Sequence, residues 1–163
     1  MLPRSATPND AAAIAQIYNE GIEDRLATFE TRLRTAEDIR KWFDGIHPVI
    51  VVEEGRRIIA FAATSAYRPR ECYSGIAEFS VYVARASRGH GAGSVAMHAL
   101  IEASQRARFW KLVSRIFAEN VASRKLVASC GFREVGTYQR HARLDGQWRD
   151  VVIVERLIDA NVT

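Results

Sequence analysis

Three glycines fall within the five residues 89–93, directly after Arg88, and they separate two regular apolar patterns. Residues 76–83 alternate as in a strand, whereas residues 92–107 carry apolar side chains at helical spacing. The first amides of a helix have no partner within it, and the helix dipole adds partial positive charge there. Glycines let an anion approach the backbone closely. The pattern therefore predicts a phosphate or pyrophosphate site at the amides of residues 89–94, with Arg88 adding positive charge.

Two common phosphate-binding motifs place glycines in a turn of this kind. A Walker A motif is excluded because no Gly-Lys-Ser or Gly-Lys-Thr follows the glycines. Residues 91–96 satisfy the dinucleotide pattern G-x-G-x-x-A, and Glu119 lies roughly 20 residues farther on. A dinucleotide fold requires a second mononucleotide-binding half, whereas only one short helix and a long hairpin follow Glu119. We keep the dinucleotide site as an alternative that tight NADH binding would favour.

The elements that must position this turn alternate along the chain. Strands are predicted at residues 1–6, 49–53, 58–67, 76–83, 111–118, 132–143 and 147–157. Helices are predicted at residues 8–22, 35–43, 92–107 and 123–130, with Thr7 and Thr35 as N-caps. Only residues 76–118 form a clear parallel strand–helix–strand unit. The order predicts one α/β (α+β) domain over residues 1–163, with a mixed sheet that carries helices on its faces.

Composition excludes several classes of protein. The apolar fraction is 48% and the net charge is +4, with basic and acidic residues interspersed, so no nucleic-acid partner is required and an anionic small ligand fits equally well. The two cysteines lack CxxC spacing, which predicts reduced thiols in a cytoplasmic protein. No apolar run suits a signal peptide or a membrane span. The four histidines lack the spacing of metal ligands, so no metal site is expected.

Several motifs together resemble one enzyme family. Residues 88–93, Arg-Gly-His-Gly-Ala-Gly, resemble the acetyl-CoA motif Q/R-x-x-G-x-G/A of the GNAT superfamily of N-acetyltransferases. Residues 120–123 and 130–132 resemble its N-x-x-S helix start and its terminal Gly-Phe. More narrowly, four segments resemble the phosphinothricin and arsinothricin N-acetyltransferases: residues 27–32, 70–73, 77–83 and 146–151. The resemblance runs over essentially the whole chain. It implies the GNAT fold, with a mostly antiparallel sheet of about seven strands, and a homodimer.

The resemblance also implies acetyl-CoA as cosubstrate. The cofactor-binding residues that it implies are Val81, Val83, Arg88, Gly89, His90, Gly91, Gly93, Ser94, Asn120 and Ser123. The backbone groups of Val81 and Val83 would pair with the pantetheine arm, although both residues also suit a plain core strand. Asn120 would hydrogen-bond the same arm, cap the helix that follows, or do both.

Glu78 is the predicted catalytic residue, because acetylation requires a neutral amine. It is an acid in a strand with apolar neighbours, just before the glycine turn. Burial raises the pKa of a carboxyl group and favours a proton acceptor that works near neutrality. The resemblance places a general base at this position. A salt-bridged strand glutamate is the alternative.

The predicted substrate pocket is basic and aromatic. Arg70 lies in the loop before the Glu78 strand, and arginine suits bidentate binding of carboxylate, phosphinate or arsinate. Arg32 is a further candidate for binding an anion. Each could instead be a surface charge. The remaining predicted substrate contacts are Phe29 and Tyr73, which match the family's pocket, and Tyr82, which shares strand parity with Glu78.

One position departs from the family pattern. Many members carry a tyrosine seven residues after the position of Asn120, as the acid that protonates the thiolate, but this chain has Val127. Valine cannot donate a proton. Tyr138 or water would then serve, or protonation of the thiolate would not limit the rate.

These observations predict transfer of acetyl from acetyl-CoA to the amino group of a small amino acid that bears a second anionic group. The resemblance points to phosphinothricin, arsinothricin or a similar glutamate analogue, acetylated by direct attack in a ternary complex. The alternatives are acetylation of a protein N-terminus or a polyamine, or a non-catalytic acyl-CoA sensor. A polyamine site should be acidic, whereas the predicted pocket segments carry arginines.

Overall fold

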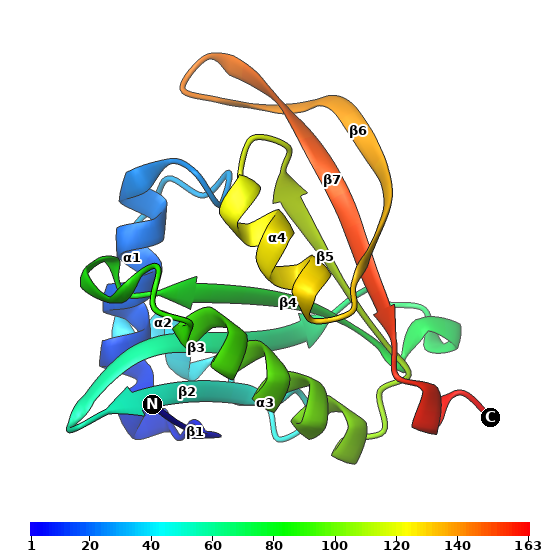
Figure 1. The fold of residues 1–163 in the computed structure, drawn as a ribbon, viewed down its shortest axis with the longest axis horizontal. Coiled ribbons are helices and arrows are strands. Elements are labelled where there is room, and N and C mark those ends of the chain that lie inside the picture. Colours follow the sequence, from blue (N-terminus) through cyan, green and yellow to red (C-terminus); the bar gives the residue numbers. More distant parts are fainter.

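The computed structural model describes all 163 residues and contains one seven-stranded sheet (Figure 1). Its strands are β1 (Leu2–Ser5), β2 (Val49–Glu54), β3 (Arg57–Ala66), β4 (Ile76–Val83), β5 (Lys111–Phe117), β6 (Arg133–Leu144) and β7 (Gln147–Leu157). Their order across the sheet is β1-β2-β3-β4-β5-β7-β6. Every neighbouring pair is antiparallel except β4 and β5. The predicted mixed, mostly antiparallel sheet is confirmed.

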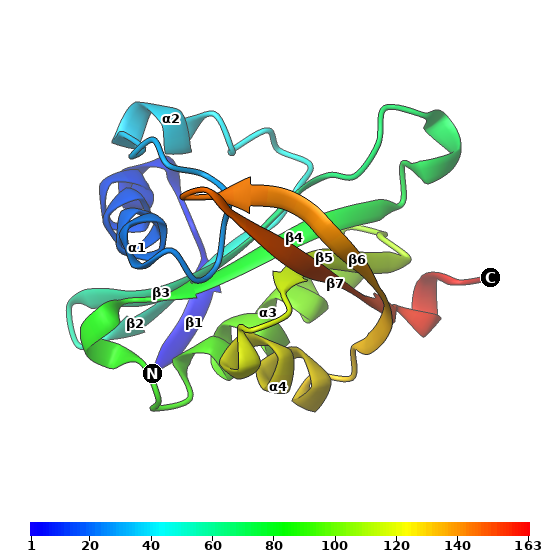
Figure 2. The same cartoon turned by 90° about the horizontal axis from the view of Figure 1, so that it is seen from above.

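Four helices cover the two faces of the sheet. They are α1 (Ala11–Asp24), α2 (Ala36–Arg40), α3 (Ala92–Arg106) and α4 (Val121–Ser129). In Figure 2, α1 and α2 lie on one side of the strands, and α3 and α4 lie on the other. The larger apolar cluster packs beneath α3 and α4, and a smaller one packs beneath α1 and α2. The core is therefore two layers separated by the central strands.

Local sequence explains where α1 and α2 begin and end. Thr7 and Thr35 both form capping boxes, as predicted, and Pro8 opens a 3-10 turn that runs into α1. Helix α2 is shorter than predicted, because Trp42 N donates to Ile39 O at 2.9 Å and tightens the chain into turns. The aromatic ring of Trp42 then packs on the α1 cluster from beyond the helix end.

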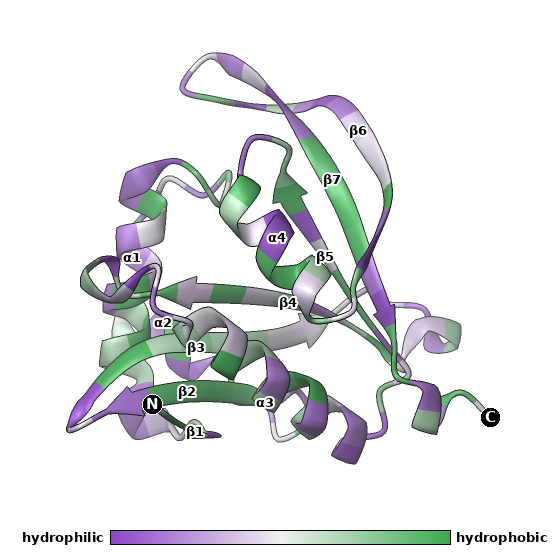
Figure 3. Cartoon of the chain, viewed as in Figure 1, coloured by the Kyte–Doolittle hydropathy of each residue, from purple (hydrophilic) through white to green (hydrophobic).

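The remaining differences also have local causes. Helix α4 begins two residues earlier than predicted, because Asn120 Oδ1 accepts from Ser123 N at 3.2 Å and caps it. The hairpin turn between β6 and β7 is confirmed, with Asp145 and Gly146 at φ values of 51° and 77°. In Figure 3, β2 is mostly hydrophobic, whereas β6 is neutral to hydrophilic. This contrast agrees with a buried β2 and an exposed β6 edge strand.

Strands β4 and β5 diverge, and this divergence positions the site. Only Ile76–Glu78 of β4 pair with β5, opposite Lys111–Val113. Beyond that point β4 keeps its pairing with β3, and β5 keeps its pairing with β7. The sheet therefore opens into a wedge between the carboxyl ends of β4 and β5, which Figure 1 shows as separating arrows.

Cys72 is exposed and Cys130 is buried, and both thiols are free. No helix combines the length and the apolar composition needed to cross a membrane. No three His, Cys, Asp or Glu side chains gather into a set that could hold a metal ion.

Candidate active site

Unpaired backbone groups of β4 face the wedge. Ser114 Oγ donates to the carbonyl of Phe79 at 2.8 Å, so the main-chain groups of Phe79 point toward β5. Main-chain groups alternate sides along a strand, so those of Val81 and Val83 point the same way. Strand β5 does not pair with these residues. The N–H and C=O of Val81 and the N–H of Val83 are thus available to an extended ligand, whereas the Val83 carbonyl accepts from Arg88 Nε at 3.3 Å.

The glycine turn at the end of β4 has the shape of an anion cradle. Gly89 and Gly91 have φ values of 81° and 90°, and no atom lies within 4 Å of where a Cβ would stand on either. The first α3 hydrogen bond is Val95 N to Gly91 O at 3.2 Å. The amides of residues 92–94 donate to no main-chain carbonyl. The turn therefore offers open space and free donors where sequence predicted them.

Two other residues of the turn have structural partners. A Cβ on Gly93 would lie 2.9 Å from Leu126 Cδ2, so the missing side chain allows α3 to pack on α4. Ser94 Oγ lies 3.3 Å from His98 Nδ1. His90 is exposed in the turn. At Gly93 and Ser94, the backbone amides are therefore the groups that remain free for an anion.

Arg88 is anchored rather than free. Its Nη1 donates to Asp24 Oδ2 at 2.6 Å, and its Nε donates to Val83 O at 3.3 Å. The cation beside the glycine turn is therefore held between the end of α1 and the end of β4.

Glu78 lies at the opposite face of the wedge and forms an ion pair. Arg115 Nη2 donates to Glu78 Oε1 at 2.8 Å, and the Glu78 side chain is 28% exposed. The apolar surroundings expected for Glu78 are therefore not found. Val113 pairs with Glu78 across the parallel strands, which places Arg115 on the same face. The geometry matches the salt-bridged alternative and still leaves the carboxylate at a cavity wall.

A cavity of about 210 Å³ adjoins Glu78. Tyr18, Trp42 and Tyr82 give it aromatic walls, and Glu78 and Arg115 give it charged ones. The predicted shared face of Glu78 and Tyr82 is confirmed. Burial raises the pKa of the Tyr82 phenol, and to a lesser degree that of Tyr18, so both stay neutral hydroxyl groups.

A second, narrower cavity of about 50 Å³ continues the first through the wedge toward α4. It reaches Asn120, Ser123 and Val127. Asn120 caps α4 and also donates from Nδ2 to Leu26 O at 3.2 Å. Val127 is buried, so it offers the cavity only an apolar wall.

Four predicted substrate residues lie outside these cavities, and three of them are on the surface. Arg70 and Tyr73 are exposed in the loop before β4, with the Arg70 guanidinium 5.8 Å from the Tyr73 ring centroid. Arg32 is 65% exposed and pairs with Asp38 at 3.2 Å, as a surface charge.

Phe29 packs against Phe117 at 4.7 Å between ring centroids, in a small cluster with the β6–β7 hairpin. It fixes the loop after α1, whose neighbouring residues Ala27 and Thr28 do line the cavity. Phe29 therefore acts as local hydrophobic packing under the loop and does not form a wall of the pocket.

Sequence reasoning missed the cation beside Glu78. Arg115 donates to the Glu78 carboxylate from the neighbouring strand, and parallel pairing of β4 and β5 would have found it.

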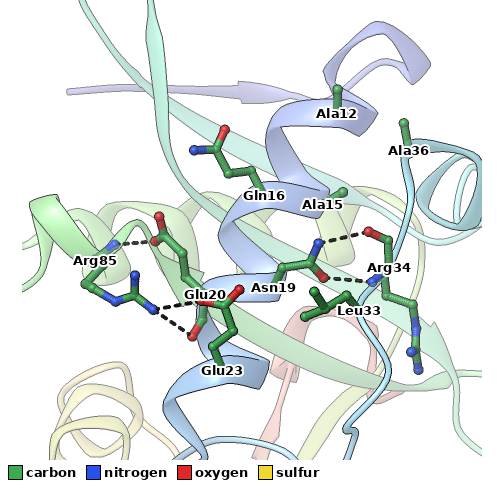
Figure 4. Close-up of a pocket in the computed structure, with 10 residues that line it drawn as sticks. All are labelled: Ala12, Ala15, Gln16, Asn19, Glu20, Glu23, Leu33, Arg34, Ala36 and Arg85. Carbon is green, nitrogen blue, oxygen red and sulfur yellow. Dashed lines mark hydrogen bonds and ion pairs between the residues drawn. The ribbon is translucent and has the colours of Figure 1, made fainter.

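A larger hollow lies elsewhere. An open groove of about 520 Å³, here called the α1 groove, runs along the outer side of α1 (Figure 4). Asn19 clamps its rim by hydrogen bonds of 2.9 and 2.8 Å to the backbone of Arg34. The groove shares no lining residue with the two wedge cavities. Size alone therefore does not identify the site.

Comparison with known proteins agrees with this geometry. Residues 4–153 match the model of the acetyltransferase (GNAT) domain. The chain is 32% identical over 160 residues to a phosphinothricin N-acetyltransferase of Streptomyces coelicolor, covering 94% of each chain. It resembles the crystal structure of a ribosomal-protein-alanine N-acetyltransferase from Brucella melitensis, with a TM-score of 0.92, 32% identity, and coverage of 97% of this chain and 100% of that chain.

A third similar protein has been solved with a ligand. It is the phosphinothricin acetyltransferase from Sinorhizobium meliloti in complex with acetyl-CoA, with a TM-score of 0.90 and 26% identity over 99% of this chain and 91% of that chain. The fold, the wedge, the glycine turn and the family match all lead to one conclusion. The chain belongs to the GNAT family of acetyltransferases.

Proposed function

We propose that this chain is a single N-acetyltransferase domain that transfers acetyl from acetyl-CoA to the amino group of a small amino-acid-like substrate. The candidate substrates are phosphinothricin, arsinothricin or a similar glutamate analogue. One observation carries the proposal: the wedge joins a free backbone edge and an anion cradle on one side to a Glu78–Arg115 pocket on the other.

The residues present fit the cosubstrate. The free N–H and C=O of Val81 and the free N–H of Val83 suit the amides of an extended pantetheine arm. The open turn at Gly89 and Gly91 suits a pyrophosphate, because nothing fills the space in front of its amides. Bound acetyl-CoA would supply the acetyl carbonyl and the thiolate leaving group.

Glu78 is the proton acceptor of this proposal. The ammonium proton would first pass to the Glu78 carboxylate, directly or through water. The neutral amine nitrogen would then form a bond to the acetyl carbon, and the carbon–sulfur bond would break. The second proton on nitrogen would leave through water, which would protonate the thiolate. Arg115 fixes the carboxylate rotamer. Val127 offers no proton to the thiolate, and Tyr138 does not line either cavity. Water in the wedge is therefore the proposed donor.

The proposed anion-binding group is Arg115, in place of Arg70. Arg115 lines the pocket beside Glu78, so the side-chain phosphinate or carboxylate of a substrate would meet its guanidinium there. Arg70 is exposed outside the pocket.

A protein N-terminus is the second candidate substrate, because one similar structure bears the name of a ribosomal-protein-alanine acetyltransferase. The pocket volume of about 210 Å³ favours a free amino acid over a chain that must continue out of the pocket.

The proposal extends to a cytoplasmic homodimer. Two free thiols suit a reducing compartment. The hairpin of β6 and β7 exposes Val135, Tyr138 and Trp148 along an unpaired sheet edge, which suits contact with a second copy.

Release of free CoA, measured against a panel of acceptors, tests this function. The panel holds phosphinothricin, arsinothricin, methionine sulfone, common amino acids and a peptide with an N-terminal alanine. We expect the small anionic amino acids to react fastest. Turnover of the peptide alone would support the second candidate, and no turnover of any acceptor would support an acyl-CoA sensor.

Matched arginine variants locate the anion site. Arg115→Gln should raise KM for phosphinothricin about tenfold more than KM for methionine sulfone, whose side chain is neutral, because a charge-assisted contact to the side-chain anion is lost only with phosphinothricin. Arg70→Gln should leave both constants near wild type. The opposite result would return the anion site to Arg70.

A further inference from the structure

The last turn of α1 carries charges of the sign that a helix end disfavours. Glu20, Glu23 and Asp24 lie there, and the turn has no basic residue. A helix C-terminus carries partial negative charge, so acids at this place destabilise the isolated helix. Their compensation must come from another element.

Two arginines of the turn after β4 supply that compensation. Arg85 Nη2 lies 2.8 Å from Asp24 Oδ1 and 3.4 Å from Glu23 Oε2, and its backbone N donates to Glu20 Oε2 at 2.6 Å. Figure 4 shows Arg85 facing Glu20 and Glu23 at one end of the α1 groove. Arg88 Nη1 contacts the other Asp24 oxygen at 2.6 Å. These arginines, Arg85 first, hold the pKa of Asp24 below its usual range.

Asp24 alone joins both arginines. Each of its two carboxylate oxygens accepts from a different guanidinium, and its side chain is 24% exposed. Glu23 contacts only Arg85 and is 54% exposed. The two acids are neighbours in the sequence with the same charge, but only Asp24 reaches the arginine of the glycine turn.

We propose that Asp24 is a positioning residue for cosubstrate binding, acting through Arg88. This inference rests on the proposed function, since it assumes that the turn at residues 88–94 binds the pyrophosphate. The contact from Nη1 to Asp24 and the contact from Nε to Val83 O fix the Arg88 guanidinium plane at two points. Its Nη2 keeps its donors free. An arginine held in advance loses less conformational entropy when an anion binds.

Positioning and plain electrostatics predict opposite results. Removing the negative charge of Asp24 would by itself strengthen binding of any nearby anion. Removing an anchor of Arg88 would weaken it. The sign of the change in acetyl-CoA affinity therefore decides between the two roles.

The experiment compares Asp24→Asn with the matched control Glu23→Gln by calorimetric titration of acetyl-CoA. Each substitution removes one charge from the same helix turn. We expect the Kd of Asp24→Asn to rise about five- to twentyfold, with KM for the amine unchanged. Glu23→Gln should stay within about twofold of wild type. An unchanged or lower Kd for Asp24→Asn, or an equal rise in both variants, would overturn the inference.

Two further measurements keep the result interpretable. Asp24→Glu keeps the charge and should retain part of the affinity, which guards against a folding defect in Asp24→Asn. In the double variant with Arg88→Gln, loss of Asp24 should add nothing further if it acts through Arg88. If Arg88→Gln and Gly91→Val both leave acetyl-CoA binding intact, the proposed cosubstrate site fails. If those two weaken binding and Asp24→Asn does not, only the positioning role fails.

Discussion

At the scale of single residues, the proton acceptor is the sharpest test of the chemistry. Glu78→Gln keeps the shape of the side chain and removes its basicity. We expect kcat to fall roughly 10²–10⁴-fold, the usual contribution of a general base, while the Kd of acetyl-CoA stays nearly constant. Initial rates of CoA release measure kcat, and calorimetric titration measures the Kd of acetyl-CoA.

Glu134→Gln is the control for this substitution. Glu134 also pairs with an arginine, Arg124 at 2.8 Å, but on the surface outside the wedge. The kcat of Glu134→Gln should equal that of wild type. Full activity of Glu78→Gln at every pH tested would mean that the amine loses its proton by another route.

The glycine turn gives a second residue-scale prediction. Gly91→Val places a side chain in the open space before the amides and should weaken acetyl-CoA binding at least about tenfold, or about 1.4 kcal/mol. Gly55→Val is matched, because Gly55 also has positive φ, +63° against +90°, and an open Cβ direction, in the β2–β3 turn. Both variants should lose some stability through backbone strain. Equal acetyl-CoA affinities in the two variants would place the pyrophosphate elsewhere.

Sequence predicted the residues of the turn better than those of the pocket. Gly89, Gly91 and the free amides follow from a local strand–turn–helix pattern, which short-range spacing reveals. Arg115 comes from another strand, and its place beside Glu78 depends on parallel register set by three residue pairs. Phe29 matched a family segment, but its packing on Phe117 depends on the distant hairpin.

At the scale of elements, an ion pair joins β1 to the start of α1. Arg4 donates to both oxygens of Asp10 at 2.8 and 2.9 Å, and the Asp10 side chain is only 10% exposed. This guanidinium holds the pKa of Asp10 below its usual range. Asp10→Asn should lower the free energy of unfolding by about 1–2 kcal/mol at neutral pH. The expected loss is smaller than for a fully buried ion pair, because Arg4 is more exposed to solvent than Asp10.

The sign of the pH dependence follows from the lowered pKa of Asp10. The stabilisation is present above the unfolded-state pKa of about 4 and is lost as pH falls through the lower folded-state pKa. Urea unfolding of wild type and Asp10→Asn should therefore differ at pH about 7 and converge in acid. Glu37→Gln, which breaks an exposed pair with Arg40, should change little at either pH. If the difference in unfolding free energy between wild type and Asp10→Asn widened in acid, the Arg4–Asp10 ion pair would not be its source.

The ends of helices were predictable from the sequence where a capping residue sets them. They were less predictable where packing against a distant side chain sets the end of the helix. Thr7 and Thr35 mark their helices in the sequence itself. The early end of α2 depends on the Trp42 ring, which packs at 5.8 Å from Tyr18 between centroids. That contact joins residues far apart in the sequence, so spacing along the chain does not reveal it.

At the scale of the whole molecule, the wedge between β4 and β5 provides the space in which the proposed cosubstrate and substrate would meet. The strands were visible in the sequence as apolar runs, as in β2 and β3, or as alternation, as in β4. The point where β4 leaves β5 was not, because both strands continue unchanged past the last shared pair. Their other neighbours, β3 and β7, supply the pairing that allows them to separate.

The last prediction concerns the proposed homodimer. Strand β6 is exposed along nearly its whole length, and Tyr138 and Trp148 are each 52% exposed on the hairpin. A stable interface buries about 800 Å² on each partner and places aromatic residues at its centre. The double variant Tyr138→Glu and Trp148→Glu should therefore sediment as a monomer, whereas wild type should sediment as a dimer. Both positions face solvent in the isolated chain, so the variant should keep its fold, which far-UV circular dichroism would check.

Leu26→Glu is a matched control, since Leu26 is a 54% exposed apolar residue outside the hairpin. If wild type sediments as a monomer at every concentration, the hairpin is a solvent-exposed edge, protected from edge-to-edge pairing by its bulge at residues 138–142.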